Sequence, residues 1–292
     1  MSDLRISSSK QFDANSMLCF SCPPFFGSKR VEAVSFVLTT HRNSSLETRL
    51  QAALDDGRKV WAVGDVHGQA DALRRLLLDM DLQPGDEVVL LGDLIDRGPD
   101  SHGVLVMARD LDHVHAIQGN HEGMMLATYT SSDASDRWHW TRNGGDVALS
   151  SMPGSTSSER DRAASRWVPF LQGLPTEIVL DRHRMVHAGY DWRRPLDQQT
   201  DEDRTWSRTI FHAKEPVDPQ RQVLVGHTPT QMLDGYGLSD PKGAYRSRVL
   251  LPDGRPSLIM LDTGAAYGRR LKGSSLTAME LGSGAVRSVP VG

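Results

Sequence analysis

Cysteine is scarce in this sequence of 292 residues. Cys19 and Cys22 are the only two, and no second pair could complete a four-ligand zinc site. The helix that usually follows a redox-active cysteine pair is also missing from the pattern. We therefore expect a reduced, cytoplasmic chain with no disulfide framework.

Long apolar runs are missing as well. No run approaches the roughly 20 residues that a membrane-spanning helix needs. The formal net charge is only −4, so the composition does not indicate a nucleic-acid binder or a protein of the membrane surface. Apolar residues make up 38% of the chain, which is enough for a substantial core.

The first 55 residues differ from the rest. They are rich in Ser and polar residues and hold no apolar segment of signal-peptide length. We interpret residues 1–55 as a flexible leader, or as the product of a start codon placed too early. The run AVSFVL within them could form a strand. The catalytic domain is predicted to span residues 56–290.

Regular patterning begins at Val60 and predicts an α/β fold. Helical patterns at 70–79 and 101–109 alternate with the first three strands, and the later strands follow one another with few helices. We expect a two-sheet β-sandwich flanked by helices, with a more antiparallel second sheet and a mainly helical excursion at about 131–173. The predicted strands are 60–63, 87–91, 114–117, 177–180, 184–187, 222–226, 257–262 and 275–281.

Three successive strands each end in a glycine followed by residues that can bind metal. The motifs are GDVHG (64–68), GDLIDRG (92–98) and GNHE (119–122). Ligands in open α/β sheets collect beyond the carboxyl ends of the strands. The three strand ends should therefore deliver their side chains to one cluster. Two later strands end in HAG and GHTP, which add two histidines.

The resulting donor set suits two divalent ions. It comprises Asp65, His67, Asp93, Asn120, His187 and His227. Mixed carboxylate and imidazole donors favour Mn, Fe or Zn over Ca, and we expect Mn. Six donors are too many for one catalytic ion but fit two ions that share a carboxylate. Such a pair holds a bridging water or hydroxide and favours in-line displacement at phosphorus. Gly64 is expected to leave room beside the metals.

Further residues fit a phosphate substrate. The guanidinium groups of Arg97 and Arg208 match phosphate oxygens in a bidentate way. The ring of His121, which follows Asn120, could protonate a leaving oxygen. Asp96 could orient that ring.

Together the motifs GDVHG, GDLIDRG, GNHE, HAG and GHTP resemble those of the phosphoprotein phosphatases, within the metallophosphoesterase superfamily. The segments WHWTRNGG and TWSR resemble the bacterial and bacteriophage lambda branch. The resemblance covers residues 59–281 and implies the calcineurin-like fold. It implies that Asp93 bridges the two ions, that His121 is the general acid with Asp96 as its partner, and that Arg97, Asn120 and Arg208 bind the substrate phosphate.

The resemblance implies a serine/threonine or dual-specificity protein phosphatase with phosphorylated proteins or peptides as substrates. The main rival is a bis(5'-nucleosyl)-tetraphosphatase, a sister branch that tends to lack the Asp-Arg pair and to carry GNHD. Asp96, Arg97 and Glu122 favour the first function. A phosphopeptide-binding module without activity is disfavoured because no ligand is missing. A cysteine phosphatase is excluded, because Phe25 and Ser28 stand where its arginine would be. The oligomeric state stays open.

Overall fold

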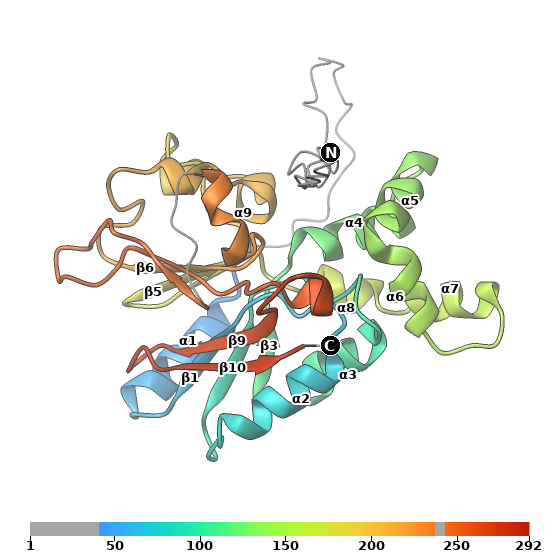
Figure 1. Ribbon diagram of the computed structural model, residues 1–292, viewed down its shortest axis with the longest axis horizontal. Coiled ribbons are helices and arrows are strands. Elements are labelled where there is room, and N and C mark those ends of the chain that lie inside the picture. The colour runs from blue at the N-terminus through green and yellow to red at the C-terminus, as the bar shows by residue number, and fades with distance from the viewer. Residues whose placement is uncertain (1–40, 237–242, 292) are drawn as a thin grey trace, which may run out of the picture. The chain divides into compact units, whose positions relative to one another are not determined.

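The computed structural model describes residues 41–236 and 243–291. Two five-stranded sheets face each other across an apolar layer, and helices cover the other side of the first sheet (Figure 1). This arrangement confirms the predicted two-sheet sandwich. Among the described residues, no helix is both long and apolar enough to cross a lipid bilayer.

The first sheet has the strand order β10-β9-β1-β2-β3. Its three parallel strands β1, β2 and β3 are short and almost fully buried, in keeping with their runs of Val, Leu and Ala. The bounds are β1 Val60–Val63, β2 Glu87–Leu90, β3 Val114–Ala116, β9 Ser275–Glu280 and β10 Val286–Pro290. Residues 275–281, the last of the later predicted strands, lie in the first sheet and not with the other later strands in the second, because β9 pairs antiparallel with β1.

The second sheet has the order β4-β5-β6-β8-β7. Its central strands β5, β6 and β8 run parallel, and only the edge pairs are antiparallel. The expected more antiparallel sheet is therefore a mixed one, because helical turns between these strands return the chain to the same end. The bounds are β4 Glu177–Val179, β5 His183–Val186, β6 Gln222–Val225, β7 Tyr245–Arg246 and β8 Leu258–Met260.

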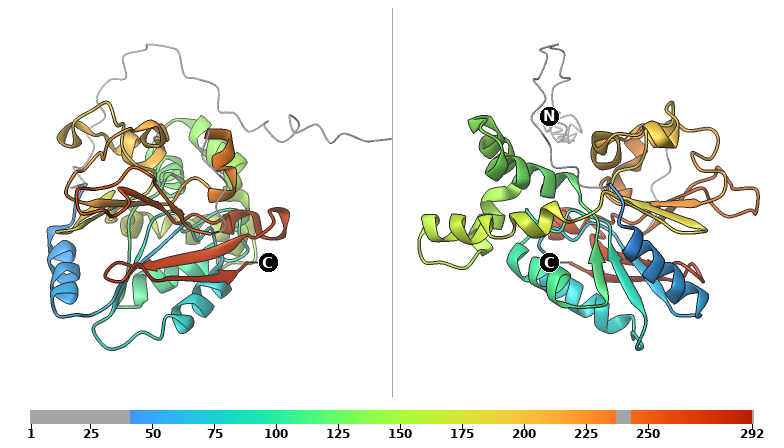
Figure 2. Two further views of the ribbon diagram at one scale, coloured as in Figure 1. Left: turned by 60° about the vertical axis from the view of Figure 1, so that its left-hand side comes forward. Right: turned by 180° about the vertical axis from the view of Figure 1, so that it is seen from behind.

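Helices α2 and α3 lie on the outer face of the first sheet, where they close an apolar cluster with α4 and the helices after it (Figure 1). Residues 131–173 fold into a group of short helices that projects to one side of the sandwich (Figure 2). The bounds are α2 Ala70–Asp79, α3 Ser101–Asp110, α4 Asn120–Thr130, α5 Ala134–Trp140, the π-helix η2 Thr141–Gly145, α6 Asp146–Ser151, α7 Ser157–Ser165 and α8 Val168–Gln172.

Short helical turns connect the strands of the second sheet and pack on its outer face. They comprise η3 Leu196–Gln198, α9 Asp201–Trp206, η4 Thr209–His212 and η5 Thr230–Tyr236, and η6 Ala265–Arg270 precedes β9.

Helix α1 (Ser44–Asp55) corrects the predicted boundary of the leader. The side chain of Asn43 caps it by accepting a hydrogen bond from the Leu46 N–H, and Leu50 is fully buried between the sheets. Glu47 accepts the N–H of Val179 in the second sheet, while Arg49 pairs with Glu87 in the first. Residues 44–55 therefore belong to the folded domain. Residues 1–40, including AVSFVL, lie outside the described residues.

Candidate metal centre

The carboxyl ends of five strands, three in the first sheet and two in the second, place the predicted site at one edge of the sandwich. Strands β1, β2 and β3 share a direction within the first sheet, and β5 and β6 share one within the second. Each is followed at its carboxyl end by predicted donor residues, and these meet between the sheets. All six predicted donors are buried there: Asp65, His67, Asp93, Asn120, His187 and His227.

One group of donors forms around His67. Its Nδ1 lies 2.9 Å from the backbone carbonyl oxygen of Ile95. Because a carbonyl oxygen only accepts, Nδ1 carries the proton and the lone pair of Nε2 faces the cluster. That Nε2 lies 3.4 Å from Asp93 Oδ2 and 3.8 Å from Asp65 Oδ2. Burial lowers the pKa of His67 to about 3, and the charge of Arg97 adds to this effect. The ring is therefore a neutral donor.

A second group forms around His187, whose Nδ1 lies 2.8 Å from the carbonyl oxygen of Leu91. Its Nε2 then faces Asn120 Oδ1 (2.9 Å), His227 Nδ1 (3.1 Å) and Asp93 Oδ1 (3.3 Å). Asp93 is common to both groups, with Oδ2 toward His67 and Oδ1 toward His187. This is the arrangement expected of a shared carboxylate.

The chemistry of these atoms fits cations. Lone pairs of imidazole nitrogens and carboxylate oxygens converge, and they repel one another unless positive charge lies between them. Asp65 Oδ2 is buried and has no hydrogen-bond partner. Burial lowers the pKa of His187, but the charge of Asp93, the hydrogen bond to Asp93 and the charge of Asp65 together raise that pKa to about 10. The cluster therefore draws in positive charge.

His121 and Asp96 form a buried pair beside the cluster. His121 Nδ1 lies 2.6 Å from Asp96 Oδ2, and neither side chain is more than 1% exposed. The other ring nitrogen, Nε2, turns toward Asp93 Oδ2 at 3.8 Å. Asp96 thus fixes the Nδ1 side of the His121 ring, and Nε2 stays directed at the space between the donor groups.

Both predicted phosphate-binding arginines reach this region. Arg97 donates from a terminal nitrogen to His67 Nε2 at 3.1 Å. Arg208 donates from Nε to the Thr228 hydroxyl at 3.1 Å, and its charge lowers the pKa of buried His227 after the larger effect of desolvation. Nε thus anchors Arg208 to the loop that follows His227, close to the second donor group.

Backbone strain concentrates at the site. Six non-glycine residues in the described parts of the chain have positive φ, and five of them are predicted site residues. Such conformations are rare outside glycine and persist only where the surroundings enforce them. The five are His67 (44°), Asp93 (48°), Asp96 (72°), Arg97 (66°) and His227 (66°).

Sequence reasoning did not assign a role to three buried residues here. Glu122 accepts the N–H groups of Asp93 (2.9 Å) and Gly119 (2.8 Å) with Oε2, and that of Leu94 (2.8 Å) with Oε1. Trp140 donates its indole N–H to Asp96. Burial raises the pKa of Asp262 to about 6, and the pKa of Asp65 is raised by its burial and then by the charge of Asp262. Glu122 and Trp140 lie in the motifs GNHE and WHWTRNGG, but their contacts depend on the fold and could not be predicted from the sequence.

The expected role of Gly64 is wrong. A Cβ at this position would lie 2.2 Å from the Leu261 backbone oxygen, so Gly64 allows β1 to approach the segment after β8. Gly226 instead leaves room for a donor, since a Cβ there would lie 2.0 Å from Asp65 Oδ1.

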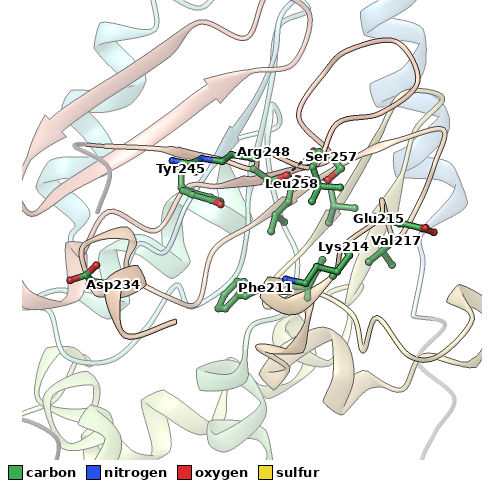
Figure 3. Close-up of a pocket in the computed structure, with 14 residues that line it drawn as sticks. Phe211, Lys214, Glu215, Val217, Asp234, Tyr245, Arg248, Ser257 and Leu258 are labelled. Carbon is green, nitrogen blue, oxygen red and sulfur yellow. Dashed lines mark hydrogen bonds between the residues drawn. The ribbon is translucent and has the colours of Figure 1, made fainter. Parts of the chain in front are cut away.

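A separate cavity of about 520 Å³ lies between η4 and the outer face of the second sheet (Figure 3). Its wall includes Phe211, Lys214, Tyr245, Arg248 and Leu258. None of the described residues that line it belongs to the predicted site. This cavity therefore does not overlap the predicted site.

Comparison with known proteins agrees with the geometry. The profile of the calcineurin-like phosphoesterases matches residues 58–261. Serine/threonine-protein phosphatase 1 of Salmonella typhimurium is 32% identical over 183 residues, which are 59% of this chain and 79% of that protein. The symmetrical bis(5'-nucleosyl)-tetraphosphatase of Paracidovorax citrulli is 46% identical over 215 residues, covering 67% and 68% of the two chains.

Solved structures share the fold. A metallophosphoesterase from Sphaerobacter thermophilus superposes with a TM-score of 0.50 at 16% identity, covering 80% of this chain and 88% of that chain. A provisionally assigned diadenosine tetraphosphatase gives a TM-score of 0.54 at 24% identity, covering 80% and 94%. At this level of identity the likeness concerns the fold alone.

Proposed function

The chain belongs to the calcineurin-like phosphoesterases, and from this premise we propose that it is a serine/threonine protein phosphatase. The membership makes it a metallophosphoesterase. The finer assignment concerns the substrate, which we take to be a phosphorylated protein or peptide. Dual specificity toward phosphotyrosine is compatible with the same residues.

The donor groups divide between two ions. Asp65, His67 and Asp93 would hold the first, and Asp93 with Asn120, His187 and His227 the second. Bound divalent ions at such a site polarise phosphoryl oxygens and supply an activated water at neutral pH. Manganese suits the mixture of carboxylate, amide and imidazole donors, and iron or zinc would also fit.

The remaining residues would bind the phosphate and donate a proton to the leaving group. Arg97 and Arg208 would hold the phosphoryl oxygens, with the Asn120 amide beside them. His121 would give the proton from Nε2 to the leaving oxygen, while Asp96 keeps the ring turned by its contact with Nδ1. These roles need no covalent intermediate on the protein, so we expect a single displacement at phosphorus.

The His121–Asp96 pair is the observation that carries the protein phosphatase assignment. Serine and threonine leave as strongly basic alkoxides, which need a proton in the transition state. A nucleotide leaves through a phosphate oxygen of far lower basicity, so an oriented acid contributes much less to that reaction. An enzyme for dinucleoside polyphosphates would gain little from this buried pair.

Hydrolysis of dinucleoside polyphosphates is the second candidate, because of the 46% identity to the Paracidovorax citrulli tetraphosphatase. Values of kcat/KM for a phosphopeptide panel and for diadenosine tetraphosphate, measured with Mn-loaded protein, separate the two. A clear preference for the dinucleotide would overturn our proposal. Aryl phosphate turnover that a chelator abolishes would rule out a binding module without activity.

The role of His121 is tested by leaving-group dependence. His121→Asn should slow hydrolysis of an alkyl phosphate by roughly 10²–10⁴-fold, the usual contribution of a positioned acid. The p-nitrophenyl ester, with its good leaving group, should be affected far less. Equal losses on both esters, with the metal content unchanged, would show that His121 is not the acid.

A further inference from the structure

The dipeptide Asp96–Arg97 holds two proposed functional side chains on a strained backbone. Both residues have positive φ, at 72° and 66°. Neither is glycine, so contacts from outside the loop must hold this conformation in place. The surrounding helices show where those contacts come from.

Trp140, the last residue of α5, supplies the first contact. Its side chain is fully buried, and its Nε1–H lies 3.1 Å from Asp96 Oδ1 and 3.0 Å from Oδ2. Gly145 lies flat against the indole, since a Cβ there would come within 2.5 Å of the ring. Desolvation by burial raises the pKa of the Asp96 carboxyl, and the indole N–H opposes this by stabilising the charged form.

Gly144 supplies the second contact. Its carbonyl oxygen accepts the Arg97 N–H at 3.4 Å. It has φ of 109° within the π-helix η2, and a Cβ would lie 2.8 Å from Arg97 Cγ and 2.9 Å from its backbone nitrogen. Only glycine permits this approach. Local π-helical turns often occur at functional sites, and this one lies against the site.

We propose that Trp140 and Gly144 form a clamp, carried by the helices of residues 134–145, that positions Asp96 and Arg97 for the reaction. Trp140 fixes the carboxylate that orients His121, and Gly144 fixes the backbone from which the Arg97 guanidinium extends. Both are positioning residues, because each acts through a neighbour. This inference rests on the proposed phosphatase activity and assigns a role to the segment WHWTRNGG.

Trp140→Phe tests the first half, because it keeps an aromatic ring and removes the N–H donor. We expect kcat for an alkyl phosphate to fall about tenfold, a part of the full contribution of the acid, while p-nitrophenyl phosphate changes little. Trp167→Phe is the matched control, since Trp167 is also buried in the same helical region and contacts His102 and Phe170 instead. It should leave both rates unchanged.

Gly144→Ala tests the second half. It should raise KM for p-nitrophenyl phosphate and weaken competitive inhibition by inorganic phosphate, each about tenfold, by moving Arg97. Gly254→Ala is the control: Gly254 also has positive φ, at 85°, but no atom lies within 4 Å of the added Cβ. It introduces the backbone strain without displacing a functional residue.

A readout without metal or turnover completes the test. In ¹⁵N-labelled metal-free protein, the indole N–H resonance that disappears in Trp140→Phe should shift in Asp96→Asn, because an amide replaces the carboxyl group that accepts the indole N–H. The corresponding resonance of Trp167 should stay in place. This measurement also serves if Trp140→Phe loses activity by partial unfolding.

The outcomes separate this inference from the proposed function. Suppose that wild-type protein hydrolyses phosphopeptides, that Trp140→Phe and Trp167→Phe have the same rates, and that Asp96→Asn leaves the indole resonance unshifted. These results would refute the clamp and leave the proposed phosphatase activity supported. If wild-type protein prefers the dinucleotide, the proposed function fails, whereas the indole measurement still reports the contact with Asp96.

Discussion

Replacing Glu122 by Gln should show how strongly the site depends on one buried carboxylate. Its two oxygens accept N–H groups from Asp93, Gly119, Leu94 and, at 3.4 Å, Ile95, which ties the second motif to the third. A glutamine amide is nearly the same size but offers one acceptor and one donor. At least one of these buried N–H groups must then face another N–H group.

The magnitude follows from these contacts. A buried donor left without a partner costs roughly 1–3 kcal/mol, and exchanging a charged acceptor for a neutral one weakens the bonds that remain. We expect Glu122→Gln to lower the free energy of unfolding by about 3 kcal/mol. Affinity for metal should fall as well, because Asp93 and its neighbours lose their anchor.

Urea unfolding and metal titration at pH 8 measure both effects. Burial raises the pKa of Glu122 to about 7, so the carboxylate is mostly charged at that pH. Glu159→Gln is the matched control, because Glu159 also accepts two backbone N–H groups, from Ser155 (2.8 Å) and Thr156 (3.0 Å), but at an exposed helix start. Equal destabilisation by the two substitutions, or unchanged metal affinity in Glu122→Gln, would refute the reasoning.

Three other outcomes are expected. Asp93→Asn should lose metal as well as activity, and retention of both ions in a metal assay would contradict the shared-carboxylate assignment. Leu50→Ala should lower the free energy of unfolding by roughly 2–5 kcal/mol, because Leu50 is fully buried; a negligible change in urea unfolding would place α1 outside the folded domain. Burial, aided by Arg255 and Arg182, lowers the pKa of His183 to about 4, below its value of 6.5 in the unfolded chain. Protonation therefore favours unfolding, and stability should fall by about 3 kcal/mol as the pH drops from 6.5 to 4, a slope that His183→Gln should reduce in urea titrations.

The clustering of the candidate donors could be predicted because each lies within four residues of the end of an apolar strand. The carboxyl ends of parallel strands meet whatever the remaining packing is, so Asp65, Asp93 and Asn120 needed only the strand pattern. Trp140 could not be placed this way. Its contact with Asp96 depends on how α5 docks and on a π-helical turn, and neither has a periodic signal in the sequence.

The two errors near the chain's start and at Gly64 have different causes. Asn43 and the residues after it carry an N-cap signal, but the polar composition before them obscured the start of α1. For Gly64 the motif correctly predicted that other atoms approach the glycine closely, but the expected neighbours were the metals. The approaching atoms belong to Leu261, which directly follows a strand of the second sheet and lies far along the chain. Sequence spacing cannot identify such a neighbour.

The division of the donors between the sheets gives the two proposed ions unequal parts in holding the sandwich together. Asp65, His67 and Asp93 all follow strands of the first sheet, so that ion binds within one layer. The other ion would bind Asn120 after a strand of the first sheet and His187 and His227 after strands of the second, and so would link the two sheets across their apolar interface. During synthesis its site is complete only after residue 227 has been added. Loss of this ion alone should therefore loosen the contact between layers, while the first site keeps its shape.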